Sequence, residues 1–154
     1  DAMFRLNAFS RDEFLAGIDR FRGMRWVTTL RAIGPYADGR SESPGESVLR
    51  LRCIDCDVRV EPQVEVRRDG RVWARIDVAN EEQLFGFEYN GTEWHSSEQH
   101  VERDRQRGDD LASEGWLLRA FGTEDVFGRA RACEAVIRST AADARRRGPV
   151  RIRG

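Results

Sequence analysis

The chain has 154 residues, enough for one domain with its own hydrophobic core. Apolar residues make up 40% and charged residues 34%, and the formal net charge is −1, so overall charge does not by itself indicate a nucleic-acid partner. No apolar run approaches the roughly 20 residues that a membrane helix needs, and we expect no membrane partner.

All 26 basic residues are arginine, so a mechanism that needs a lysine ammonium has none in this chain. The cysteines, Cys53, Cys56 and Cys133, are odd in number, which argues against a closed disulfide framework and favours a reducing, cytoplasmic compartment. Cys53 and Cys56 have CxxC spacing, but a zinc site takes about four ligands and a second pair is missing. With Leu49 they follow helical spacing, which favours core packing over a metal or redox role.

Residues 1–42 are expected to form a helical lead-in, which could belong to a preceding domain. Ser10 and Glu13 make a capping-box pattern at a helix start, and Gly23 suits its end. A second short helix follows and ends near Gly34-Pro35. Such a pair can be a DNA-reading helix-turn-helix, although most helix pairs are packing units.

The main domain is expected to span residues 43–147, with a basic tail over 148–154. It begins with a helix, because Ser43, Pro44 and Glu46 suit an N-cap, a first helical residue and a capping-box partner. Alternation and turn signals predict a three-stranded antiparallel meander, a helix, a fourth strand parallel to the third, and a last helix capped by Thr123. The expected strands are 63–67, 71–79, 84–90 and 116–121, and the expected helices 98–113 and 126–145. The fold class is therefore α/β, a mixed central sheet flanked by helices with a helical N-terminal lead-in.

Polar side chains gather on the second and third of these strands. Strict alternation places Val72, Ala74, Ile76 and Val78 on one face of the second strand and Asp77 on the other. If the apolar faces of both strands meet the core, then Asp77, Glu88 and Asn90 point the same way. Carboxylates on adjacent strands supply the hard oxygen ligands that Mg²⁺ prefers. A metal there can polarise a phosphodiester and lower the pKa of a bound water, which is the chemistry of backbone hydrolysis in nucleic acids.

The segment IDV followed by FEYNG resembles the motif pair of the PD-(D/E)XK nuclease superfamily. The continuation NGTEWH is similar to a segment of very-short-patch-repair (Vsr) endonucleases that ends in Phe-Trp-His. The upstream SPGES and the downstream VERDRQRGDDLASEGWLLRAF resemble the small Vsr-like domains. The resemblance covers roughly residues 43–140 and implies a restriction-endonuclease-like fold.

The resemblance also implies DNA as partner and Mg²⁺, with Mn²⁺ as a substitute, as cofactor. Asp77 and Glu88 match metal ligands, with the backbone carbonyl of Tyr89 as a third. Glu46 matches the acidic residue of the helix before the sheet, and His95 matches a histidine that shuttles a proton or contacts a phosphate. The candidate DNA contacts are Gln63, Arg75, Trp94 and Arg107.

Asn90 departs from the family pattern, where lysine is usual and aspartate is frequent in the small Vsr-like domains. Its carbonyl can bind water or metal, but it is no general base. The expected function is therefore a metal-dependent DNA endonuclease in repair or defence. The alternatives are a weak or inactive DNA-binding or regulatory module and a protein-interaction module. Without any site, Asp77 or Glu88 would form solvated ion pairs with Arg75 or Arg50.

Overall fold

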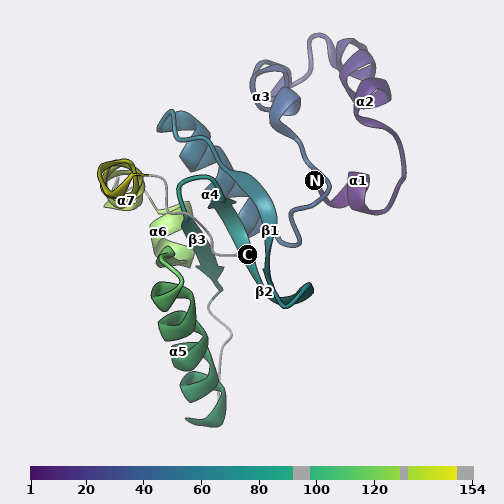
Figure 1. The fold of residues 1–154 in the computed structure, drawn as a ribbon. Helices are drawn as coiled ribbons and strands as arrows, with labels where there is room; N and C mark the ends of the chain where they lie inside the picture. The colour runs from purple at the N-terminus through teal and green to yellow at the C-terminus, as the bar shows by residue number, and fades with distance from the viewer. Residues whose placement is uncertain (92–97, 129–131, 149–154) are drawn as a thin grey trace.

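The computed structural model describes residues 1–91, 98–128 and 132–148 and shows a four-stranded sheet with helices on both faces (Figure 1). A group of short helices formed by residues 1–42, the N-terminal lobe, lies to one side. The lobe contains α1 (Ala2–Arg5), α2 (Arg11–Gly17), η1 (Ile18–Phe21), α3 (Val27–Ile33) and η2 (Gly34–Tyr36). The remainder contains α4 (Pro44–Asp55), β1 (Glu61–Arg68), β2 (Arg71–Asn80), β3 (Phe85–Asn90), α5 (Glu98–Ser113), β4 (Leu117–Gly122), α6 (Thr123–Phe127) and α7 (Ala132–Arg147).

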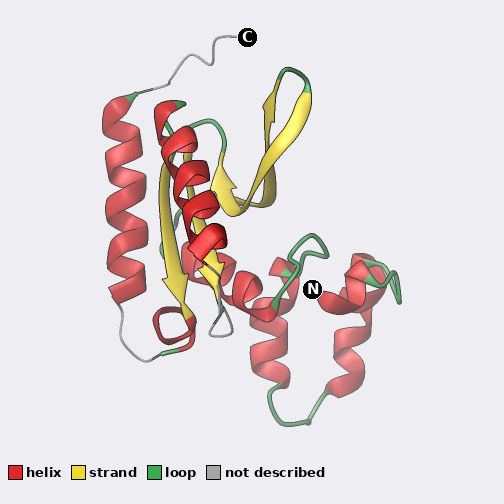
Figure 2. Ribbon diagram, turned by 90° about the horizontal axis from the view of Figure 1, so that it is seen from below, coloured by secondary structure: helices red, strands yellow, loops and turns green. Residues whose placement is uncertain are grey.

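The sheet has the strand order β1-β2-β3-β4, with antiparallel pairs among the first three strands and a parallel β3–β4 pair. The parallel pair follows from the crossover through α5, because such a connection returns the chain in the same direction. The expected α/β fold with a mixed sheet is therefore confirmed. The tight turn at Asp69-Gly70 joins β1 and β2 into a hairpin that extends beyond the helices (Figure 2).

Two apolar clusters, one on each face, hold the helices to the sheet. The larger includes Leu49 of α4, Ile137 of α7 and Phe87 of β3. The smaller includes Leu111 of α5 and Ile76 of β2. The prediction that the cysteines pack in the core is confirmed, because Cys53, Cys56 and Cys133 are free, buried and part of the larger cluster. Burial also raises the pKa of the Cys53 thiol, which keeps it protonated and unreactive.

The prediction that side chains alternate strictly between the two faces of β2 is wrong at one point. Ala74 and Ile76 pack in the smaller cluster, on the same face as α5, whereas Val78 packs in the larger cluster on the other face. The register with β1 pairs Pro62 with Val78 and Val64 with Ile76, and Gln63 between them has a left-handed φ of 54°. A left-handed residue disturbs the pleat, so the faces exchange around Asp77 instead of continuing through it.

The last helix differs from the expected single element over 126–145. The structure has α6 and α7 instead, and α6 ends where the chain becomes extended at Gly128. A Cβ on Gly128 would lie 2.1 Å from the carbonyl oxygen of Glu124, so a side chain there is excluded. The predicted cap at Thr123 is also wrong: Gly122 is the N-cap, and its N–H donates to Asp125 Oδ2 at 2.8 Å.

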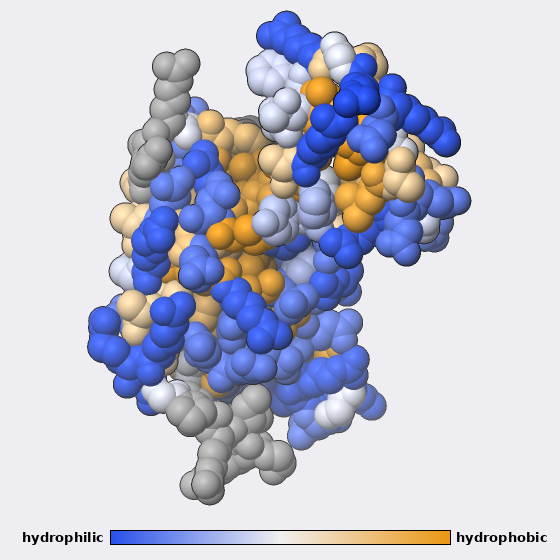
Figure 3. Space-filling view, turned by 90° about the horizontal axis from the view of Figure 1, so that it is seen from above, coloured by the Kyte–Doolittle hydropathy of each residue, from blue (hydrophilic) through white to orange (hydrophobic). Residues whose placement is uncertain are grey.

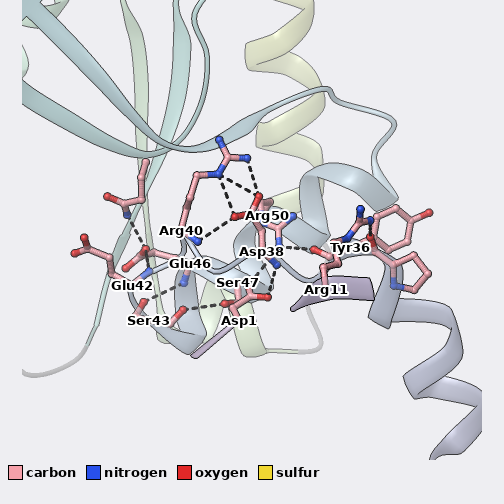
Figure 4. A network of polar contacts seen from close by, with 12 residues as sticks. Asp1, Arg11, Tyr36, Asp38, Arg40, Glu42, Ser43, Glu46, Ser47 and Arg50 are labelled. Atoms are coloured by element: carbon pink, nitrogen blue, oxygen red, sulfur yellow. Dashed lines mark hydrogen bonds and ion pairs between the residues drawn. The ribbon is translucent and has the colours of Figure 1, made fainter. Parts of the chain in front are cut away.

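Polar contacts attach the N-terminal lobe to α4 and β1 (Figure 4). Arg40 bridges Asp38 at 2.7 Å and Glu61 at 2.8 Å, and Arg50 of α4 contacts Asp1 at 3.3 Å and donates to the carbonyl of Tyr36. Inside the lobe, the rings of Phe4, Phe9 and Phe14 pack together. Over the described residues, no helix combines the length and apolar character required to cross a membrane.

Candidate active site

The first turn of α4 carries Glu46, a buried carboxylate with only 8% of its surface exposed. Ser43 Oγ accepts a hydrogen bond from the Glu46 N–H at 3.2 Å, so the predicted cap is present. The reciprocal half of the expected capping box is displaced by one residue, because Glu46 Oε2 accepts from the N–H of Glu42 at 2.7 Å. The same oxygen accepts from Gln63 Nε2 at 2.8 Å. Glu46 is therefore held in a fixed orientation between α4 and β1.

Tyr89 of β3 fixes the position of α4 relative to the sheet. A Cβ added to Gly45 would lie 2.1 Å from the Tyr89 ring, so the ring occupies the space that a side chain would need. The Tyr89 hydroxyl is 3.1 Å from Thr123 Oγ1, and its ring meets Phe127 edge-on with centroids 6.1 Å apart. Tyr89 thus joins α4, β3 and α6 and brings Glu46 toward the end of β3.

Replacing Gly45 with alanine is expected to lower the free energy of unfolding by about 1 to 3 kcal/mol, the usual cost of overpacking. The reason is the 2.1 Å approach of the new methyl group to Tyr89. The matched control is Gly108→Ala in α5, where a Cβ meets nothing within 4 Å. That change should instead stabilise the chain by up to about 1 kcal/mol, because alanine favours helix. Urea unfolding measures both, and equal stability of the two variants would contradict the packing argument.

Asp77 lies where β2 and β3 separate. The β2–β3 pairs run from Asn80↔Phe85 to Val78↔Phe87 and stop before Asp77. Asp77 Oδ2 instead accepts the N–H of Tyr89 at 2.9 Å. The carboxylate therefore reaches across to β3 and replaces a main-chain acceptor at the end of the ladder.

The ionisation of Asp77 is unusual for an aspartate. Burial raises the pKa of its carboxyl to about 6, and the charges of Glu46 and Glu88 contribute to the rise. The Tyr89 N–H and the Arg107 guanidinium act in the opposite direction but do not cancel it. Asp77 is thus close enough to Glu46 and to Glu88 to be repelled by both, and these three residues are called the acidic cluster from here on.

Glu88 of β3 is paired with Arg107 of α5, with 2.7 Å between Oε1 and Nη1. Arg107 also donates to the backbone carbonyl of Arg75, so one guanidinium links α5 to both β2 and β3. The alternative to a metal site, an ion pair of Asp77 or Glu88 with Arg75 or Arg50, named the wrong arginines. Arg75 is exposed and pairs with Glu42 at 2.9 Å, and Arg50 pairs with Asp1.

The structure therefore gathers Glu46, Asp77 and Glu88, together with Gln63 and Arg107, around the end of the β2–β3 ladder. Asn90 lies two residues after Glu88, at the end of β3. Its side chain is exposed, and it pairs with Gly122 of β4. His95 and Trp94 lie outside the described residues.

No three His, Cys, Asp or Glu side chains within residues 1–91, 98–128 and 132–148 are arranged to hold a metal ion. Each carboxylate of the acidic cluster also has another partner. Glu88 forms an ion pair with Arg107, and Asp77 accepts a hydrogen bond from the Tyr89 N–H. Glu46 accepts hydrogen bonds from Gln63 and from the Glu42 N–H. The oxygen donors suit a hard cation such as Mg²⁺, and a cation at Glu88 Oε1 would compete with Arg107 for that oxygen.

Sequence reasoning missed two features of this region. The Arg107–Glu88 pair was not foreseen, because it depends on how the crossover helix lies against the sheet. The Gly45–Tyr89 contact did leave a signal: a glycine in a helical first turn costs about 1 kcal/mol relative to alanine, so a close approach there was a reasonable expectation.

Comparison with known proteins identifies relatives without an assigned activity. The chain is 32% identical over 127 residues to the uncharacterized proteins MT2308 and Rv2248 of Mycobacterium tuberculosis, from strains CDC 1551 and H37Rv. The match covers 82% of this chain and 47% of each relative, so the chain spans about half the length of the curated relatives it matches. No family model matches the chain, and no solved structure matches it significantly.

Proposed function

We propose that the chain is a metal-dependent nuclease that hydrolyses phosphodiester bonds in DNA at the acidic cluster. The observation that carries this proposal is the position of Asp77, which is partly buried and repelled by Glu46 and Glu88, so that its pKa is raised to about 6 although Arg107 and the Tyr89 N–H oppose the rise. A folded chain gains no stability from such repulsion. A partly buried carboxylate with a perturbed pKa beside other acidic side chains is characteristic of functional sites.

Asp77, Glu88 and the backbone carbonyl of Tyr89 would hold Mg²⁺ or Mn²⁺, which supplies charge neutralisation at the phosphate and an activated water. The chain's own residues have supporting roles. Gln63 donates to Glu46 and keeps that carboxylate oriented toward the cluster. Arg107, once released from Glu88, is positioned to offset the charge that develops on a phosphate.

A second candidate is a nuclease-fold module that binds DNA or regulates a partner without cutting. Two observations favour it. Glu88 is already satisfied by Arg107 at 2.7 Å, and Asn90 stands where the resembling nucleases usually have lysine. This candidate predicts salt-dependent DNA binding without cleavage.

The test is cleavage of supercoiled plasmid DNA in Mg²⁺ or Mn²⁺, with EDTA as the blank. The wild-type chain should nick the plasmid, and Glu88→Gln should reduce the rate on the order of 100-fold or more, the usual cost of removing an electrostatic contact to the reacting group. The matched control is Glu65→Gln, an exposed acid of β1 that pairs with Arg67 and should cut at the wild-type rate.

DNA binding without cleavage in either ion would establish the non-catalytic candidate. Cleavage by Glu88→Gln at the wild-type rate would remove the acidic cluster from the mechanism. Neither binding nor cleavage by the wild-type chain would contradict both candidates and leave a protein-interaction role.

A further inference from the structure

The turn between α2 and α3 exposes an unusual set of side chains. Every residue from 19 to 26 is exposed, and we call this segment the arginine–tryptophan turn. It carries Phe21, Met24 and Trp26, with 44%, 59% and 66% of their surfaces exposed. Large apolar side chains grouped in this way on a surface usually mark an interaction site.

Apart from Asp19, every charged side chain of the turn is positive. Asp19 is paired with Arg31 at 2.9 Å. Arg20, Arg22 and Arg25 form no ion pair with any residue that the structure describes. The turn therefore presents three guanidinium groups between exposed apolar side chains. Figure 3 shows hydrophilic and hydrophobic residues side by side over the N-terminal lobe.

The backbone holds this arrangement in a defined shape. Gly23 has φ 83°, which only glycine adopts readily, and it closes the turn. Trp26 has φ 68°, a conformation that a bulky residue adopts at a cost. The Arg25 guanidinium lies 4.8 Å from the centre of the Trp26 ring, so the indole and a positive charge form one platform.

We propose that the arginine–tryptophan turn binds single-stranded DNA, with a base stacked on Trp26 and backbone phosphates on Arg20, Arg22 and Arg25. Arginines interleaved with exposed aromatic rings are how proteins hold single strands, because every base has a face for stacking and every link has a charge. A duplex buries those faces, so it cannot use the indole. The choice of DNA rests on the function proposed above, but the surface itself is separate from the acidic cluster. The turn lies at the outer end of the N-terminal helices, away from α5 (Figure 1).

Fluorescence anisotropy with a labelled oligo-dT strand and a labelled blunt-ended duplex, in EDTA to prevent cleavage, tests this proposal. Trp26→Ala should weaken oligo-dT binding on the order of 10-fold and leave duplex binding unchanged, because stacking is lost only for unpaired bases. Trp26→Phe should recover most of the loss, because a ring remains.

The triple variant Arg20→Gln, Arg22→Gln, Arg25→Gln should reduce the slope of log affinity against log salt by about 2, because each phosphate contact on a single strand contributes about 0.7. The matched control removes the same charge elsewhere, at the exposed Arg59, Arg71 and Arg119, and should keep the wild-type slope. Since all six side chains are exposed, thermal unfolding should be unchanged in both triple variants.

The proposal is overturned if wild-type chain does not bind oligo-dT, or if Trp26→Ala and the turn variant bind it with the wild-type affinity and salt slope. Failure of the proposed nuclease activity gives a different result. In that case the turn variants lose oligo-dT binding as expected, but wild-type chain does not cut DNA in Mg²⁺ or Mn²⁺.

Discussion

Asp77→Asn is expected to stabilise the folded chain at pH 8 and, if the proposed function is correct, to abolish DNA cleavage. Burial and the neighbouring Glu46 and Glu88 raise the pKa of Asp77 from 3.8 to about 6, so its charged form is disfavoured in the folded state. Asparagine keeps an oxygen that can accept the Tyr89 N–H but carries no charge. The expected gain in the free energy of unfolding is about 1 to 3 kcal/mol, since one pKa unit corresponds to about 1.4 kcal/mol and the group is partly solvated.

The pH dependence has a definite sign. Above pH 6 Asp77 is charged in both states, and the wild-type chain bears the whole cost of the buried charge. As the pH falls through 6 toward 3.8, the folded state takes up a proton before the unfolded state does, so this group makes the wild-type chain more stable. The advantage of Asp77→Asn should therefore be largest above pH 7 and close to zero near pH 4.

Urea unfolding at pH 4, 6 and 8 measures this difference. Asp69→Asn is the matched control, because it makes the same chemical change in an exposed hairpin turn where Asn-Gly is as suitable as Asp-Gly. The control should show no pH-dependent gain. Asp77→Ala should be less stable than Asp77→Asn, because it leaves the Tyr89 N–H without its acceptor. An Asp77→Asn variant that is less stable than wild type at pH 8 would contradict the electrostatic argument.

The fold was predictable because its signals are local. The cap at Ser43, the turn at Asp69-Gly70 and the crossover through α5 each follow from a few adjacent residues, and together they determine the mixed sheet. The last helix was predicted less well. α6 ends at Gly128, where the Glu124 carbonyl leaves no room for a side chain, and such a contact has no periodic pattern in the sequence.

Alternation along the strands singled out Asp77, Glu88 and Asn90, and the family resemblance added Glu46, but the geometry of these side chains was not predictable. Alternation placed Asp77 and Glu88 on neighbouring strands, yet it assumed a regular pleat. The left-handed Gln63 breaks that pleat, and Asp77 turns toward the Tyr89 N–H. The partner of Glu88 comes from α5, and its choice of Arg107 depends on helix orientation rather than on spacing along the chain.

Arg107→Gln is expected to destabilise the folded chain, because the positive charge of Arg107 opposes the repulsion around Asp77. Without divalent metal, the variant loses the ion pair to Glu88 and weakens the attachment of α5 to Arg75. The free energy of unfolding at pH 8 should fall by about 1.5 to 3 kcal/mol, the range for a hydrogen bond between charged groups. The loss should be smaller at pH 5, where protonation of Asp77 relieves part of the repulsion.

Divalent metal should reverse this loss if Arg107 and a cation compete for Glu88. In the wild-type chain, a metal at Glu88 competes with the Arg107 guanidinium for the carboxylate. In Arg107→Gln the carboxylate is free, so Mn²⁺ should raise the unfolding midpoint at pH 8 more in the variant than in wild type. Cleavage should nevertheless fall, because the phosphate loses its guanidinium.

The matched control is Arg105→Gln on the same helix. Arg105 pairs with Glu102 at 2.7 Å and Asp109 at 2.8 Å, but all three side chains are exposed, and such pairs contribute about 0 to 1 kcal/mol. Its stability and its response to Mn²⁺ should match wild type. An equal Mn²⁺ response in Arg107→Gln and wild type would show that the cation does not use Glu88. A metal site would then have to be built without this carboxylate, and the exchange at Glu88 would play no part in the function.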